Sequence, residues 1–192
     1  MSQTIEYKDY TIVIEQDDHP MNPREEDANL GNMLCRHTRY NLGDDHMADR
    51  EEVLDILEGR RKDVVAFPLY LYDHGNITMN TTGFSCPWDS GMVGCIFMTF
   101  DNIRKAYNVK RVTKKLIEKV KDSLRAEVRE YDGYISGNVY GFWIQKDGEY
   151  TPRLLSKYAD CWGFYGDEGL QHAIKEAKFS IDQIKDEEEV TA

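Results

Sequence analysis

The chain has 192 residues, of which 41% are hydrophobic and 31% are charged, a composition that excludes a globally disordered chain and suits one folded domain. Its formal net charge is −11. An acidic surface repels the phosphates of nucleic acids and membranes, so the charge predicts no direct binding of nucleic acid and no membrane contact, and favours a basic protein partner.

Compartment and redox state can also be predicted. The first ten residues, MSQTIEYKDY, lack a basic region followed by an apolar one, and no apolar run approaches the roughly 20 residues that cross a bilayer. We therefore expect a cytoplasmic protein whose thiols stay reduced. The cysteines are then free thiols, metal ligands or core residues rather than disulfide partners: Cys35, Cys86, Cys95 and Cys161.

The first part of the chain predicts strands separated by turns. Residues 7–16 (YKDYTIVIEQ) are rich in β-branched residues and predict a strand, and residues 24–30 predict a short helix that ends at Gly31. The segment NMLCRHT, residues 32–38, predicts a second strand, and a turn follows around Gly43.

The middle of the chain predicts a helix and a hairpin. In DREEVLDILEG, Asp49 can cap a helix, Glu52 can complete a capping box and Gly59 ends the helix. The segment DVVAFPLYLYDHGNITMNT predicts a hairpin that turns at DHGN, with Pro68 at an edge or a bulge. The apolar run MVGCIFMTF predicts a buried strand.

The last part of the chain carries the clearest helix, over residues 113–131, because apolar side chains recur every four residues along it. A strand and a turn at Asp147-Gly148 follow, then a strand and a helix from about Glu168. Without a regular βαβ rhythm, we expect an α+β fold: a mostly antiparallel sheet with three to four helices in a single domain over residues 1–182. Residues 183–192 predict an acidic, disordered tail.

One stretch, residues 32–46, concentrates metal-binding residue types. In a strand over residues 33–37, the Cys35 thiol and the His37 imidazole share one face, and the turn around Gly43 can bring His46 back toward them. Such residues are zinc ligands, and the candidates are Cys35, His37, His46 and His74. The chain has no CxxC pair and Met33 shares the strand face, so a buried polar cluster is the other interpretation.

Two predicted turns carry residue types found in hydrolases. Asp73-His74 and Asp89-Ser90 lie near Cys86, but spacing alone does not bring a nucleophile, a base and a carboxylate together. GFSCP is not a nucleophile elbow, because Pro87 replaces the second glycine. Aspartate and serine side chains also stabilise ordinary turns, and we assign no catalytic residue.

The outer face of the helix over residues 113–131 is basic, and VKRVTKK lies at its start. Such a face can touch nucleic acid. Acidic residues are interleaved along it, so we interpret it as a solvated helix face: Glu118, Asp122, Glu127 and Glu130.

Three segments together resemble a widespread set of small proteins carried by bacteriophages and other mobile elements: NPREEDANLGNMLCRHTRYNLGDDH, FPLYLYDHGNITMNTTGFSCPWDSGMVGCIF and CWGFYG. The resemblance covers about residues 7–178, and CPWDSG is its most specific part. The chain also resembles an anti-CRISPR family, inhibitors of the type II CRISPR effector nuclease. This resemblance implies a protein in the cytoplasm of a host bacterial cell that binds the effector and blocks its action on target DNA.

We therefore interpret the chain as an inhibitor of a host defence system that acts by binding rather than by catalysis. Its carboxylates would occupy a basic groove of a nucleic-acid-handling enzyme, with exposed aromatic side chains as anchors. The candidate partner-binding residues are Asp44, Asp45, Trp88, Asp89 and Tyr165. The alternative is a metal-dependent hydrolase that acts on a nucleotide or a signalling molecule.

Overall fold

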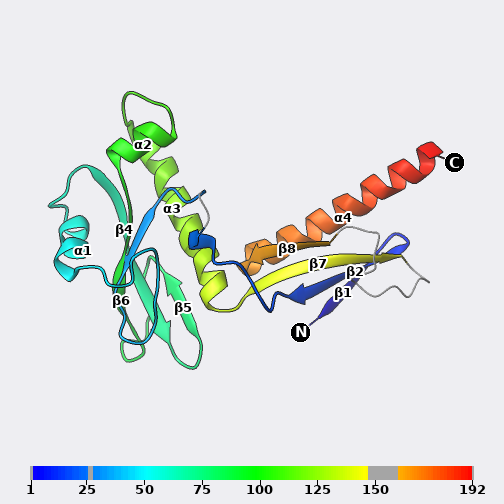
Figure 1. Ribbon diagram of the computed structural model, residues 1–192, viewed down its shortest axis with the longest axis horizontal. Coiled ribbons are helices and arrows are strands. Elements are labelled where there is room, and N and C mark those ends of the chain that lie inside the picture. Colours follow the sequence, from blue (N-terminus) through cyan, green and yellow to red (C-terminus); the bar gives the residue numbers. More distant parts are fainter. Residues whose placement is uncertain (1, 26–27, 147–159, 192) are drawn as a thin grey trace. The chain divides into compact units, whose positions relative to one another are not determined.

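The structure, a computed structural model, describes all of the chain except residues 1, 26–27, 147–159 and 192. The chain forms two compact units. Residues 1–21 and 137–192 form the terminal unit, and residues 22–136 form the central unit. Each unit contains a four-stranded antiparallel sheet (Figure 1).

The terminal unit joins the two ends of the chain in one sheet. Its strands are β1 (Gln3–Tyr7), β2 (Tyr10–Gln16), β7 (Val139–Lys146) and β8 (Asp160–Tyr165), in the order β1-β2-β7-β8. Helix α4 (Gly166–Thr191) follows β8. Alternate residues of β2 and β7 pack against α4 in a buried cluster: Tyr10, Ile12, Ile14, Phe142 and Ile144 with Ala173, Ala177 and Ile181.

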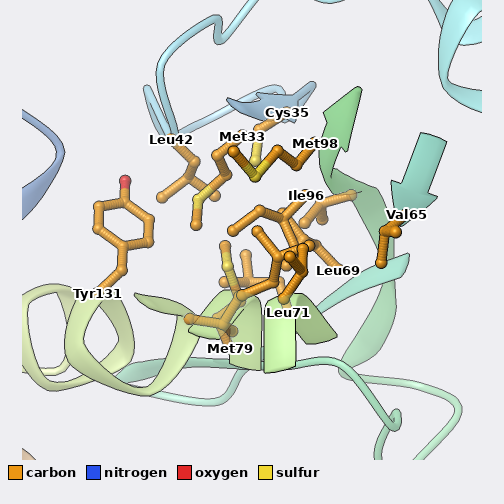
Figure 2. Packing of buried hydrophobic residues seen from close by; sticks show 14 of the residues in the cluster. Met33, Cys35, Leu42, Val65, Leu69, Leu71, Met79, Ile96, Met98 and Tyr131 are labelled. Carbon is orange, nitrogen blue, oxygen red and sulfur yellow. The ribbon is translucent and has the colours of Figure 1, made fainter. Parts of the chain in front are cut away.

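The central unit has the sheet order β3-β6-β4-β5, with β3 (Asn32–Cys35), β4 (Val64–Asp73), β5 (Ile77–Asn80) and β6 (Ser90–Thr99). Its helical segments are η1 (Pro23–Glu25), α1 (Arg50–Leu57), α2 (Phe100–Ala106) and α3 (Lys114–Ile135). Side chains of β6 alternate between two cores. Ile96 and Met98 join the cluster beneath α3 (Figure 2), whereas Cys95 and Phe97 join α1.

The α+β class and the antiparallel pairing are confirmed, with four α-helices among the described residues, and the fold is consistent with one domain built from two units. Asp49 caps α1, as its position predicts. Pro68 lies next to a bulge at Leu69/Tyr70, and β5 pairs with β4 only from Tyr70 onward, so no strand faces the proline on that side.

Three sequence expectations differ from the structure, and one helix was not expected. The strand predicted over residues 7–16 is confirmed at Tyr10–Gln16 as β2, but it begins later than predicted, because the chain turns at Lys8, which has a positive φ of 55°, and β1 precedes the turn. The short helix predicted over residues 24–30 is a 3-10 turn at Pro23–Glu25, and α2 was not predicted. Helix α4 continues to Thr191, through most of the predicted disordered tail, residues 183–192.

The turn predicted at Asp147-Gly148 lies outside the described residues. Within the part of the chain that the structure describes, no helix combines the length and the apolar character that crossing a membrane requires.

Candidate functional site

An open hollow of about 670 Å³ lies in the central unit, where three segments of the sequence meet. One segment follows β3, one ends β4, and one precedes and begins β6. They contain the motifs CRHTR, YDHG and CPWDSG, which are separate in the sequence. The charged and aromatic residues that line the hollow are Arg36, His37, Arg39, Asp73, Trp88 and Asp89.

Strand pairing explains why these segments meet. β4 and β6 are antiparallel with Tyr72 opposite Ser90, and the Asp73 N–H donates to the Asp89 carbonyl at 2.8 Å. On the other side of β6, the Arg36 N–H donates to the Val93 carbonyl at 2.7 Å. The backbone ladder of the sheet therefore fixes the three segments around the hollow.

Trp88 is the outstanding side chain of this site, because 91% of its surface is exposed. Leaving the large apolar ring of a tryptophan in water is unfavourable, and buried tryptophans dominate many protein interfaces. Polar groups surround it: Arg39 forms an ion pair with Asp73, and Arg36 is exposed. An exposed aromatic ring beside charged groups is suited to binding a partner surface.

The histidine, carboxylate and thiol in these turns do lie together. His74 Nδ1 is 3.2 Å from Asp89 Oδ2, and the Cys86 thiol donates to the same oxygen at 3.6 Å. In a nucleophilic triad the imidazole stands between the nucleophile and the carboxylate. Here the carboxylate stands between the other two, so the thiol contacts Asp89 and not the imidazole, and this order favours a structural or binding role.

The four candidate zinc ligands lie in different surroundings. Cys35 is fully buried in the core beneath α3, and burial raises the pKa of its thiol to about 12. His37 stacks on Tyr40 with ring centroids 5.0 Å apart, His46 is exposed, and His74 contacts Asp89. Across the residues that the structure describes, no three His, Cys, Asp or Glu side chains are grouped to hold a metal ion.

The end of β3 explains this separation. The strand ends at Cys35, two residues before His37, so the alternation expected over residues 33–37 does not extend to the histidine. Met33 and Cys35 share a buried apolar face, so the described residues of this stretch do not form the buried polar cluster of the other interpretation either.

The remaining partner candidates are spread over both units. The Asp44 carboxylate is engaged by residues of its own unit. It accepts from Arg24 Nε at 2.8 Å, from Arg24 Nη2 at 2.7 Å and from the Met33 N–H at 2.7 Å. The exposed Asp45 accepts from the Met47 N–H at 2.8 Å. Tyr165, in the terminal unit, donates to the Met21 carbonyl at 2.8 Å.

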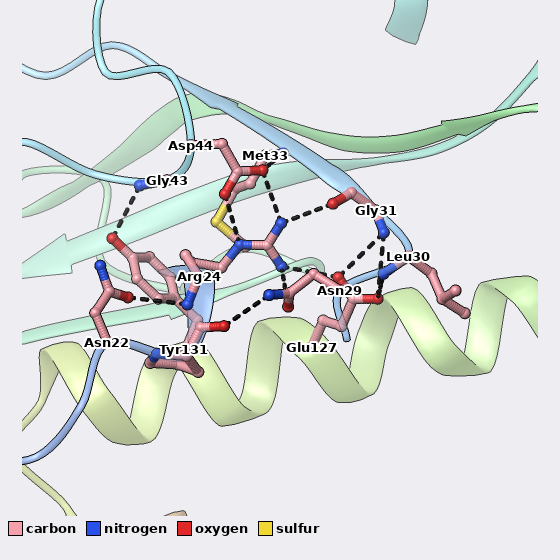
Figure 3. A network of polar contacts seen from close by, with 11 residues as sticks. Asn22, Arg24, Asn29, Leu30, Gly31, Met33, Gly43, Asp44, Glu127 and Tyr131 are labelled. Carbon is pink, nitrogen blue, oxygen red and sulfur yellow. Dashed lines mark hydrogen bonds and ion pairs between the residues drawn. The ribbon is translucent and has the colours of Figure 1, made fainter. Parts of the chain in front are cut away.

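Arg24 and Glu127 form a buried ion pair that the sequence analysis did not find (Figure 3). Their side chains are 3% and 12% exposed, and Nη1 of Arg24 is 2.8 Å from Oε2 of Glu127. Glu127 also accepts from the backbone N–H of Leu30 and Gly31. The interpretation of Glu127 as part of a solvated face was therefore wrong. Its spacing of three residues from Leu124 places it beside the apolar stripe, and this was the available signal.

Comparison of the chain with protein-family models, with curated proteins and with solved structures finds no match. The site is therefore interpreted from its own geometry.

Proposed function

We propose that the protein is an inhibitor that works by binding a host defence enzyme, and that the type II CRISPR effector nuclease is its target. The observation that carries the proposal is Trp88, which is 91% exposed in the connection between β5 and β6, two residues before β6 begins. The resemblance of the chain to mobile-element proteins and anti-CRISPR inhibitors supports the choice of target.

The distribution of charge supports a basic partner. The terminal unit contains 16 acidic and 7 basic residues, a net charge of −9, and the central unit contains 19 acidic and 17 basic residues, a net charge of −2. The terminal unit therefore carries most of the net negative charge of the chain. Clefts that hold nucleic acid are basic, so the terminal unit is the part suited to such a groove.

The order of groups around Asp89 also favours binding over nucleophilic catalysis. The acceptor that faces the Cys86 thiol is a carboxylate that His74 already contacts. The exposed Trp88 ring and the ion pair of Arg39 and Asp73 line the same hollow, where a partner could contact both. Such a combination of an aromatic anchor and a polar rim is typical of protein interfaces.

The test is inhibition of target-DNA cleavage by the guide-loaded effector nuclease. We expect the wild-type protein to inhibit, and Trp88→Ala to raise the half-inhibitory concentration about tenfold or more, as loss of an interface anchor does. Met21→Ala is the matched control: Met21 is also apolar and 69% exposed, and we expect inhibition within about twofold of wild type.

Two results would contradict the proposal: no inhibition and no complex with the effector on size-exclusion chromatography, or equal inhibition by the wild type and Trp88→Ala. Repeating the titration at low and high salt tests the electrostatic part separately. If carboxylates occupy a basic groove, binding weakens as salt rises.

A further inference from the structure

The corner where α2 joins α3 has a charge opposite to that of the whole chain. Residues 104–121, here called the basic corner, contain eight basic residues and one acid, Glu118, in a chain of net charge −11. The basic residues are Arg104, Lys105, Lys110, Arg111, Lys114, Lys115, Lys119 and Lys121. Helix α2 thus adds Arg104 and Lys105 to the basic face that VKRVTKK and the helix over residues 113–131 predict.

Most of these cations are available to a ligand. Arg104 pairs with Asp101, Lys121 pairs with Glu118 at 2.8 Å, and Lys119 lies 5.0 Å from the centroid of the Tyr107 ring. The other five are exposed and form no ion pair with any residue that the structure describes: Lys105, Lys110, Arg111, Lys114 and Lys115.

Three acids that are interleaved along α3 neutralise only one cation of the basic corner, Lys121. Glu127 is buried against Arg24, Asp122 lies 3.3 Å from Arg125, and Glu118 is engaged with Lys121. Each of these carboxylates therefore has its own cation. The five unpaired cations keep their charge at the surface.

The surface of the basic corner is concave, because a hollow lies there. The hollow has a volume of about 550 Å³, and Arg111, Lys115 and Lys119 line it together with Val109 and Leu116. Glu118 and Asp122, which also line it, are the two acids already paired. A strand of phosphates could therefore contact several cations across one concave surface.

The placement of Lys114 and Lys115 is unfavourable for the fold alone. Both lie in the first turn of α3, whose 22 residues include no acid in that turn. The positive end of the helix dipole disfavours cations in this turn. Residues that weaken their own helix in this way are typical of sites shaped by binding.

We propose that the basic corner binds the phosphodiester backbone of nucleic acid. The inference goes beyond the proposed function, which concerns a protein partner, and does not depend on it. It replaces the expectation, drawn from the net charge, that the chain does not bind nucleic acid. Exposed charges further away than about 10 Å are largely screened at 0.1 M salt, so the charge close to the binding surface determines whether phosphates are attracted. A membrane is less suitable, because Val109 is only 36% exposed and Leu116 is partly buried, which leaves little apolar surface to insert.

The test is fluorescence anisotropy of the full chain with a labelled DNA duplex of arbitrary sequence. We expect binding at low salt that weakens as salt rises, and a loss of about tenfold or more in the Lys110→Glu/Arg111→Glu variant. The control Arg50→Glu/Lys175→Glu makes the same change in net charge at exposed residues of α1 and α4, and we expect a loss of less than about twofold. A Lys110→Gln/Arg111→Gln variant should bind with intermediate affinity, and circular dichroism should show that all variants fold.

Absence of binding to duplex DNA and to single-stranded DNA and RNA at low salt would overturn the inference. So would equal losses in both charge-reversal variants, or tighter binding to phosphatidylserine vesicles or to polyglutamate than to DNA. The effector nuclease is not present in this experiment, and Trp88→Ala should bind DNA as the wild type does. Failure of the inference and failure of the proposed function are therefore distinguishable.

Discussion

Arg24 connects three segments of the central unit through a single guanidinium group. All five N–H donors of the group are used: two bind Asp44, and the others bind Glu127, the Asn29 side chain and the Gly31 carbonyl. Burial alone would lower the pKa of Arg24, but the hydrogen bonds to the two carboxylates outweigh burial and raise it. The Arg24 side chain therefore stays charged despite its burial.

Removal of this cation should be strongly destabilising. Arg24→Met leaves Asp44 and Glu127 without their partner, and we expect the free energy of unfolding in urea to fall by about 3–5 kcal/mol. Arg104→Met is the control, because Arg104 and Asp101 are exposed, and it should change the free energy by less than about 1 kcal/mol. Similar losses in the two variants would contradict a special role for the network.

Strand β6 carries a close contact that only glycine permits. Gly94 lies opposite Cys35 of β3, and a Cβ atom at Gly94 would be 1.9 Å from the Leu34 carbonyl oxygen. The same strand contains Gly91, around which a Cβ atom would meet nothing within 4 Å. The two glycines of this strand thus have different structural importance.

The two positions form a matched pair for mutation. Gly94→Ala should separate β3 from β6 and lower the free energy of unfolding by about 3 kcal/mol or more. Gly91→Ala should change it by no more than about 0.5 kcal/mol. Thermal and urea unfolding measure both effects, and equal stability of the two variants would show that the β3–β6 contact relaxes easily.

Elements with strong local signals could be predicted, and elements that depend on distant residues could not. Helix α3 and the β4–β5 hairpin follow from apolar periodicity and from the DHGN turn. The β1–β2 hairpin was missed because Lys8-Asp9 lacks the glycine or asparagine that usually marks such a turn. The hollow beside Trp88 and the pair of Arg24 and Glu127 arise from tertiary contacts, which local patterns do not contain.

At the scale of the whole molecule, the central unit buries groups that must stay protonated. Burial raises the pKa of the Cys35 and Cys95 thiols and of the Tyr131 hydroxyl to about 12 each. All three residues have higher pKa values in the folded than in the unfolded chain. Their contribution to stability is therefore complete below the unfolded pKa and is lost as pH rises through the folded pKa.

The fold should consequently weaken in alkali. Cysteine thiols of the unfolded chain ionise near pH 8.5 and tyrosines near pH 10. We expect the contribution of these groups to the free energy of unfolding, measured in urea, to be constant below about pH 8 and to fall steadily from about pH 9 toward pH 12. A Cys35→Ala/Cys95→Ala variant should show a shallower fall, and a slope identical to that of the wild type would exclude the thiols as its cause.

The central unit is inserted in the sequence of the terminal unit, and this affects the order in which the two units can fold during synthesis. A ribosome releases β1 and β2 long before β7, so the nascent hairpin must wait with one edge unpaired while residues 22–136 emerge. The contact between Arg24 and Glu127 joins the entry of this insert to a point near its exit. If the central unit folds first, it brings its two ends together, and the loop that must close when β7 pairs with β2 becomes short. The chain would then fold from its middle toward its ends.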